Sequence, residues 1–142
     1  MKHLLTHLAV GVLLSACGTD PGSLESSDAP VARYDWAARD GAMDALLEGT
    51  LEMRDGCLVV NPSWDDADAV VVAAFPRDYA SWDADREVLS YAGRDYGIGD
   101  SIWAGGGSVP PPTDAVIPTA CAVGAGDDVF LVQATSLEPP GG

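Results

Sequence analysis

Alternation of apolar and polar residues marks one segment of the chain as a half-buried strand. From Leu47 to Arg54, leucine, glycine and methionine alternate with glutamate, threonine and arginine, the period-two pattern of a strand with one face in a core. Asp55-Gly56 follows, a dipeptide typical of tight two-residue turns, and the apolar run Cys57 to Val60 comes next. The pattern predicts a β-hairpin, ended by Asn61-Pro62-Ser63.

Short apolar runs between glycine- and proline-rich turns predict further strands. These runs are Ala69 to Phe75, Val88 to Tyr91, Ser101 to Ala104 and Val129 to Gln133. Two segments are ambiguous: Tyr34 to Leu46 has near-helical apolar spacing weakened by Gly41, and Asp78 to Glu87 fits one helical turn or a loop. We therefore expect a mainly β fold, a small antiparallel barrel of five or six strands.

The first residues have the pattern of an export signal. Lys2 precedes an apolar run that ends at Leu14, which is too short for a permanent membrane-spanning helix of about 20 residues. The sequence Leu14-Ser15-Ala16-Cys17 resembles the lipobox of bacterial lipoproteins. The resemblance implies cleavage before Cys17, acylation of Cys17 and anchoring in the lipid bilayer at the extracytoplasmic face of the cell membrane. An ordinary secretory signal with a chance cysteine at the cut is the alternative.

Composition divides the chain into four parts. Residues 1–16 are the expected lipoprotein signal peptide, and residues 17–33 are rich in Gly, Ser, Pro and Asp, a composition typical of a flexible tether. Residues 34–137 are the expected β-barrel domain. Residues 138–142, with two prolines and two glycines, are expected to form a disordered tail.

Charge and composition exclude several functions. The formal charge is −15, and cleavage before Cys17 removes Lys2 and both histidines, so the expected mature chain carries −16 with neither Lys nor His. Ser-His and Cys-His nucleophile pairs, histidine-bearing zinc sites and a phosphate-binding loop with lysine are therefore excluded. Nucleic acid binding needs a basic groove, which this acidic chain does not supply. We expect no cofactor.

The two remaining cysteines, Cys57 and Cys121, are expected to form a disulfide. An exported chain meets an oxidising compartment, where an even pair of cysteines is most simply bridged. Two buried free thiols are the alternative.

Several short motifs of the mature domain resemble those of small uncharacterised OB-like secreted lipoproteins of high-GC bacteria. They are Gly56-Cys57-Leu58, Gly99-Asp100, the run Gly105-Gly106-Gly107, and Cys121. The resemblance covers about residues 47–132 and implies an OB-like barrel but no known activity.

Two acidic clusters beside tryptophans are candidate sites. Asp65, Asp66 and Asp68 follow Trp64, and paired carboxylates of this cluster, or of the cluster that follows Trp82, can hydrolyse glycosides. Asp83, Asp85 and Glu87 follow Trp82 and are a candidate calcium site. The candidate is weak, because Val88 and Arg94, at the sixth and twelfth positions of the loop, do not fit an EF-hand. Solvated acidic loops are the alternative for both clusters.

Trp64 and Trp82 are also candidates for stacking on a ligand, such as the sugar rings of an envelope glycan. The alternative is that they plug the ends of the barrel. The sequence as a whole predicts a non-enzymatic binding module at the cell envelope, with a glycan or an envelope protein as its unknown partner. A carboxylate-based hydrolase of wall glycans and a purely structural envelope protein remain open.

Overall fold

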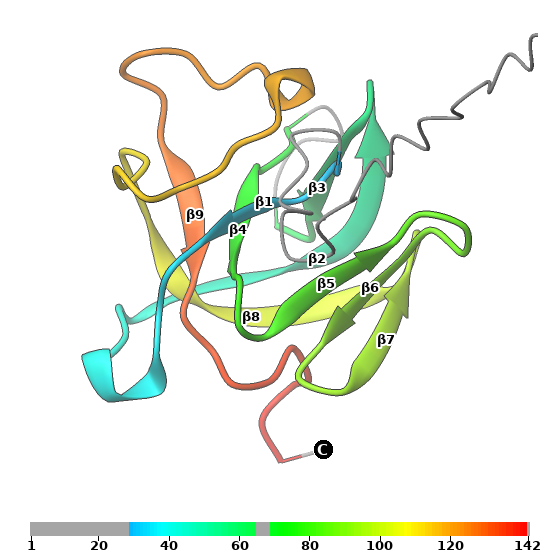
Figure 1. Ribbon diagram of the computed structural model, residues 1–142. Coiled ribbons are helices and arrows are strands. Elements are labelled where there is room, and N and C mark those ends of the chain that lie inside the picture. The colour runs from blue at the N-terminus through cyan, green and yellow to red at the C-terminus, as the bar shows by residue number, and fades with distance from the viewer. Residues whose placement is uncertain (1–28, 65–68, 142) are drawn as a thin grey trace, which may run out of the picture.

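The computed structural model describes residues 29–64 and 69–141, which contain nine β-strands, two short 3-10 turns and no α-helix. Six strands form a larger sheet in the order β1 (Ala32–Tyr34), β4 (Ala73–Pro76), β9 (Val129–Val132), β8 (Ser101–Val109), β2 (Ala45–Arg54) and β3 (Cys57–Pro62) (Figure 1). The smaller sheet consists of β5 (Ala80–Asp83), β6 (Val88–Tyr91) and β7 (Arg94–Gly97). The 3-10 turns are η1 (Ala38–Asp40) and η2 (Thr119–Cys121). The predicted mainly β fold is confirmed, with more strands than the five or six expected.

The hairpin predicted from the alternating pattern is present. β2 and β3 pair antiparallel in a register that places Leu51 opposite Val60. Asp55 and Gly56 both have positive φ, 51° and 85°, as a two-residue hairpin turn requires. Aspartate tolerates this conformation and glycine adopts it without a steric cost.

The larger sheet is mixed and not purely antiparallel. β4 pairs in parallel with both β1 and β9, whereas the other ladders of this sheet are antiparallel. β4 is completely buried, as its apolar composition predicted. The prediction of one strand from Ala69 to Phe75 was nevertheless too long, because the strand begins at Ala73 and only an isolated bridge at Val71 precedes it.

β8 pairs with two different strands along its length. Its first half pairs with β2 and its second half with β9, and Gly106 takes part in both ladders. Gly106 has a φ of 154°, and a Cβ atom built on it would lie 1.8 Å from the carbonyl oxygen of Leu131. Glycine therefore allows β9 to approach the point where β8 changes partner.

The ladders of the larger sheet do not close into a ring. A single antiparallel bridge joins β3 to the segment before β4, through hydrogen bonds of 2.9 and 2.8 Å between the backbones of Val60 and Val71. The backbone N–H of Leu58 in β3 also donates to the carbonyl of Pro30, just before β1. The edges are thus close at isolated points, without a continuous ladder between β1 and β3.

The smaller sheet includes two strands that the sequence pattern did not predict. Asp78 to Glu87, which was expected to be a loop or a helical turn, contains β5. β7 follows β6 after a turn in which Ala92 and Gly93 both have positive φ. Similarly, the ambiguous segment from Tyr34 to Leu46 contains the end of β1, the short turn η1 and the start of β2 in place of a longer helix.

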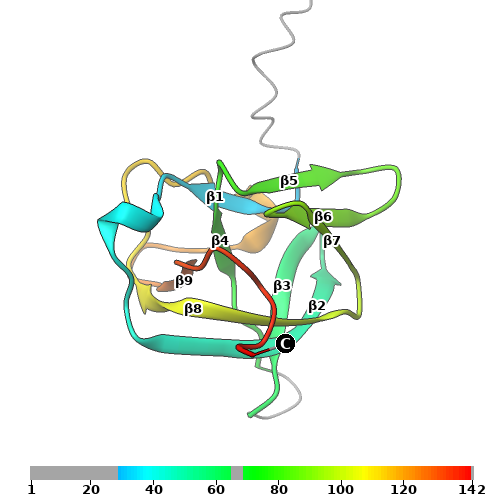
Figure 2. The same cartoon turned by 90° about the horizontal axis from the view of Figure 1, so that it is seen from below.

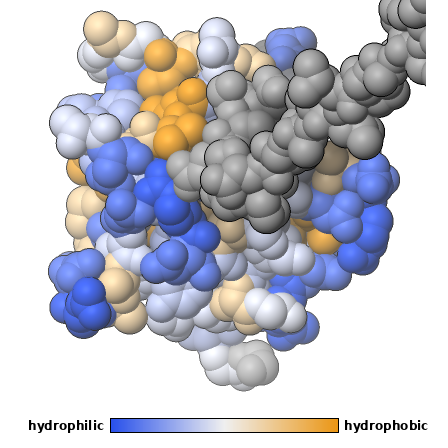
Figure 3. Space-filling view, viewed as in Figure 1, coloured by the Kyte–Doolittle hydropathy of each residue, from blue (hydrophilic) through white to orange (hydrophobic). Residues whose placement is uncertain are grey.

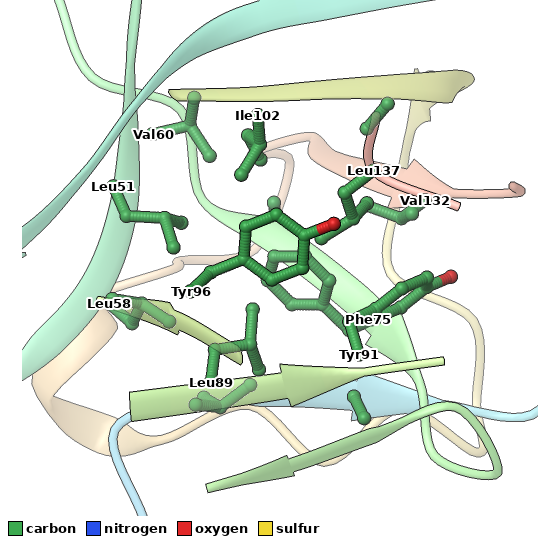
Figure 4. Close-up of a cluster of buried hydrophobic side chains, with 14 of the residues drawn as sticks. Leu51, Leu58, Val60, Phe75, Leu89, Tyr91, Tyr96, Ile102, Val132 and Leu137 are labelled. Carbon is green, nitrogen blue, oxygen red and sulfur yellow. The ribbon is translucent and has the colours of Figure 1, made fainter. Parts of the chain in front are cut away.

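The main hydrophobic core lies between the two sheets, which face each other in Figure 2. Figure 4 shows side chains from both sides pointing toward one another. The smaller sheet contributes Leu89, Tyr91 and Tyr96, all at most 5% exposed, and the larger sheet contributes residues such as Leu51 and Ile102. Burying such side chains contributes about 1.5–3 kcal/mol each to the free energy of unfolding.

A second hydrophobic cluster lies on the other face of β1, β4 and β9. It contains Tyr34, Trp36 and Leu131, and the partly buried Ala115 and Ile117 pack against it. These last two residues belong to the segment between β8 and η2, over which Figure 3 shows a compact hydrophobic patch. The long segment before β9 therefore covers the face of the larger sheet that points away from the smaller one.

The predicted disulfide joins Cys57 and Cys121, with an S–S distance of 2.02 Å and a Cα–Cα distance of 4.9 Å. It ties the start of β3 to η2 and spans 64 residues of sequence. The folded chain also begins earlier than the expected residue 34. Val31 and Ala32, assigned to the tether, are 3% and 0% exposed and belong to the two core clusters.

Candidate functional site

The two tryptophans that were predicted to stack on a ligand have different environments. Trp82 lies on β5 opposite Leu89 and packs against the main core. Trp64 is 58% exposed, in the turn that follows β3. Neither residue lines the main groove described below.

The acidic loop after Trp82 does not bring together a metal site. Asp83 accepts hydrogen bonds of 3.1 Å from the backbone N–H groups of Asp85 and Arg86, so its carboxylate stabilises the turn after β5. In the described part of the chain, no three His, Cys, Asp or Glu side chains lie close enough to hold a metal ion. The calcium arrangement of Asp83, Asp85 and Glu87 is therefore not formed.

Several sequence predictions lie outside the described residues. They concern Cys17, the expected lipidation site, and the candidate hydrolytic carboxylates Asp65, Asp66 and Asp68.

The main candidate site is a groove of about 450 Å³ at the C-terminal end of the domain. Its walls come from residues 36–42 around η1, from Leu46 on β2, from Trp103 and Gly105 on β8, and from residues 133–140 after β9. The volume is within the range of small-ligand sites, about 300–1,000 Å³. The groove thus joins four segments that are distant in sequence.

Two indole rings provide the aromatic surface of the groove. Ile102 and Ala104 point into the core, so the intervening Trp103 lies on the outer face of β8, half-buried and opposite Glu48 of β2. Trp36 is 9% exposed, and its indole N–H donates to the carbonyl of Gly41 at 2.8 Å. The indole N–H of Trp103 has no hydrogen-bond partner among the described residues and is not buried.

Polar groups at the rim are held in place by neighbours. Glu138 accepts a hydrogen bond of 2.8 Å from the hydroxyl of Tyr96 and lies 3.3 Å from the guanidinium of Arg94. Gln133 accepts a hydrogen bond of 2.7 Å from the backbone N–H of Met43 through its side-chain oxygen. Side chains that are fixed in this way lose less conformational entropy when they bind a ligand.

Three tyrosines hold the C-terminal segment that forms one wall. Tyr34 donates to the carbonyl of Val132 at 2.7 Å, Tyr91 donates to that of Ala134 at 2.5 Å, and Tyr96 donates to Glu138. Burial raises the pKa of all three hydroxyls, and that of Tyr96 reaches about 12, also because the neighbouring carboxylate disfavours a second negative charge. The neutral hydroxyls therefore remain donors well above neutral pH.

A second, smaller hollow of about 260 Å³ lies where β2 meets β3 and β8. It is lined mainly by short polar side chains, among them Thr50, Ser63 and Ser101, and has no aromatic residue in its wall. The side-chain N–H of Asn61 at this hollow donates to Glu52. The larger groove combines aromatic and polar groups and is the stronger candidate.

Local sequence patterns do not identify the groove. Ser101 to Ala104 was predicted as a strand, and alternation within it would have placed Trp103 on the face opposite Ile102. Nothing in the local pattern indicated that residues 133–140 cross this face. The groove depends on contacts between distant segments, such as the hydrogen bond of 2.9 Å from the backbone N–H of Trp103 to Leu137.

No known protein family, characterised protein or solved structure matches this chain. Within residues 29–64 and 69–141, no helix has the length and apolar character needed to cross a membrane.

Proposed function

We propose that this protein is a membrane-anchored lipoprotein of the extracytoplasmic face that binds a ligand or partner at the cell envelope without catalysing a reaction. The observation that carries the proposal is the distribution of the three cysteines. Cys57 and Cys121 form a disulfide, which leaves Cys17, at the end of the lipobox-like sequence, available for acylation.

The disulfide supports an extracytoplasmic location. Such bonds form and persist in oxidising compartments and are rare in the cytosol. The export-signal pattern that ends at Cys17 is consistent with the same location.

The length of chain after Cys17 limits the distance between anchor and domain. Among the described residues, Val31 is the first that belongs to the main core, and 14 residue steps separate it from Cys17. Even a fully extended chain of this length spans at most about 50 Å. With acyl chains on Cys17 the domain would stay close to the membrane, although its negative charge repels anionic head groups.

The groove supports a binding role. It combines aromatic surface with a carboxylate and an amide that are held in fixed positions, which is the composition of many small-ligand sites. For the fold, we retain the OB-like barrel as part of the proposal, supported by the bridge between Val60 and Val71 at the sheet edges.

Metabolic labelling with palmitate tests the proposal. We expect the wild-type chain to carry the label and to fractionate with membranes, and Cys17→Ala to lose both properties. The Cys57→Ala/Cys121→Ala double variant is the matched control, because it removes the other two cysteines and should keep the label. Label that remains on Cys17→Ala would contradict the proposal, as would a wild-type protein in the soluble cell interior with its first methionine unmodified.

A further inference from the structure

We propose that the groove between Trp103 and Glu138 binds a neutral saccharide chain, an inference that rests on the proposed binding function and specifies its ligand. The site differs from Trp64 and Trp82, which the sequence suggested. It is formed by β8, the start of β2, the η1 segment and the C-terminal segment.

The floor of the groove is suited to the apolar face of a sugar ring. Trp103 projects from the outer face of β8, and Leu46, which is 42% exposed, lies in the same groove. Trp36, which is 9% exposed, also lines the groove and is fixed by its hydrogen bond to Gly41 and by contact with Tyr79, at 5.9 Å between ring centroids. A flat aromatic surface that is partly open gives affinity when a ring covers it.

The hydrogen-bonding groups of the groove fit a hydroxyl better than a charged group. The free indole N–H of Trp103 can donate a hydrogen bond, and the carboxylate of Glu138 can accept one. A ligand hydroxyl can form both hydrogen bonds, because it can accept one from Trp103 and donate one to Glu138. A ligand carboxylate or phosphate could not donate to Glu138, and an ammonium group could not accept from Trp103.

Charge also favours a neutral ligand. Among the described residues, no Lys, Arg or His side chain lines the groove, so an anionic ligand would find no cation in the wall to pair with. Arg94, which lies 3.3 Å from Glu138, already balances that carboxylate. A cationic ligand would therefore gain little from it, because partly exposed charges are screened by water and by the existing partner.

The site is formed before the ligand arrives. Tyr96 and Arg94 orient Glu138, and Met43 orients Gln133 through its backbone N–H. The hydrogen bond from Trp103 to Leu137 fixes the C-terminal segment beside the indole. Such preorganisation reduces the entropy lost on binding, which matters for ligands that bind weakly.

Tryptophan fluorescence and calorimetric titration of the full chain in detergent micelles test the inference. The probes are tetrasaccharides of β-1,4-linked N-acetylglucosamine and of β-1,4-linked glucose. We expect saturable binding of at least one, and a dissociation constant raised at least about tenfold, or about 1.4 kcal/mol, by Trp103→Ala and by Glu138→Gln. Trp64→Ala, which removes an exposed indole outside the groove, should leave binding unchanged. The thermal midpoints of the groove variants should stay near that of the wild type.

Three results would overturn the saccharide assignment. The first is that neither tetrasaccharide shows saturable binding. The second is that Trp64→Ala and Trp103→Ala weaken saccharide binding equally. The third is that choline or a lysine-rich peptide binds in place of sugar, with the same dependence on Trp103. If palmitate remains on Cys17 in these cases, the anchored lipoprotein of the proposed function stands without this ligand. Loss of the Cys17 label from the wild type instead contradicts the proposed function, whatever the titration shows.

Discussion

Removal of the Cys57–Cys121 disulfide should destabilise the domain more than most single substitutions. The comparison is between Cys17→Ser and the triple variant that adds Cys57→Ala and Cys121→Ala. The Cys17→Ser background leaves no thiol that could form a wrong disulfide with the remaining cysteines. Only the presence of the cross-link then differs between the two proteins, apart from the loss of the sulfur atoms.

The sequence separation of the cysteines sets the size of the effect. The bridge spans 64 residues, and the entropy that such a cross-link removes from the unfolded chain corresponds to about 4 kcal/mol at 25 °C. Cys57 is 2% exposed, so the loss of its sulfur also removes some packing. Small domains have a total free energy of unfolding of about 5–15 kcal/mol. The triple variant should therefore lie near the limit of stability.

Urea unfolding followed by tryptophan fluorescence measures this difference. With a urea dependence of about 2 kcal/mol per molar, a loss of about 4 kcal/mol lowers the midpoint by about 2 M. The slope should rise slightly, because the unfolded chain without the cross-link exposes more surface. Reduction of the disulfide in the Cys17→Ser protein should reproduce the same midpoint.

A loss of less than about 1 kcal/mol in the triple variant would refute the reasoning. It would mean that the unfolded chain keeps residues 57 and 121 close together without the bond, or that the native state relaxes when the bond is removed.

Two further predictions concern the central strands and the tyrosines. Gly106→Ala should lower the free energy of unfolding, measured by chemical denaturation, by about 2–4 kcal/mol, because the added Cβ would lie 1.8 Å from the carbonyl oxygen of Leu131 and φ is positive. At Gly105 the nearest atom to an added Cβ is 3.8 Å away, so Gly105→Ala should lower it by less than about 1 kcal/mol. Equal losses for the two variants would contradict this prediction. Tyr96 and Tyr91 have raised pKa values in the folded protein, to about 12 for Tyr96, so their contribution to stability is complete below pH 10 and is lost as the pH rises toward 12. A titration of tyrosine absorbance with parallel circular dichroism should show these hydroxyls ionising together with unfolding, and ionisation near pH 10 with the fold intact would contradict the prediction.

The hairpin of β2 and β3 could be predicted because local signals agree with the final structure. Alternation in Leu47 to Arg54 matches the buried face of β2, and Asp55-Gly56 suits the turn that the ladder needs. The disulfide was predictable for a different reason, since a chain that is expected to be exported, with two cysteines besides Cys17, has one simple pairing.

Two of the three strands in the smaller sheet, β5 and β7, could not be predicted from local patterns, whereas β6 was predicted as Val88 to Tyr91. The strands of this sheet have four residues each, and β7 begins with the exposed charged pair Arg94-Asp95. The turn before it places Ala92 at a φ of 50°, a conformation that alanine seldom adopts. Packing of Leu89 and Tyr96 against the larger sheet stabilises this element, and such a contact is not visible in a short window of sequence.

The groove was missed for the same physical reason. Trp103 was placed on a predicted strand, but its importance depends on the C-terminal segment, which the sequence predicted to end as a disordered tail from residue 138. Glu138 instead contacts both Tyr96 and Arg94. A composition rich in proline and glycine therefore did not indicate the absence of specific contacts.

The position of β9 has a consequence for how the chain reaches its final state. This last strand lies between β4 and β8, and it is the element that joins the β1–β4 pair to β8, β2 and β3. Until residues 129–132 are available, those two parts of the larger sheet have no ladder between them. Completion of the sheet must therefore wait for nearly the entire polypeptide, so the earlier strands cannot assemble into the final sheet while the chain is still being synthesised.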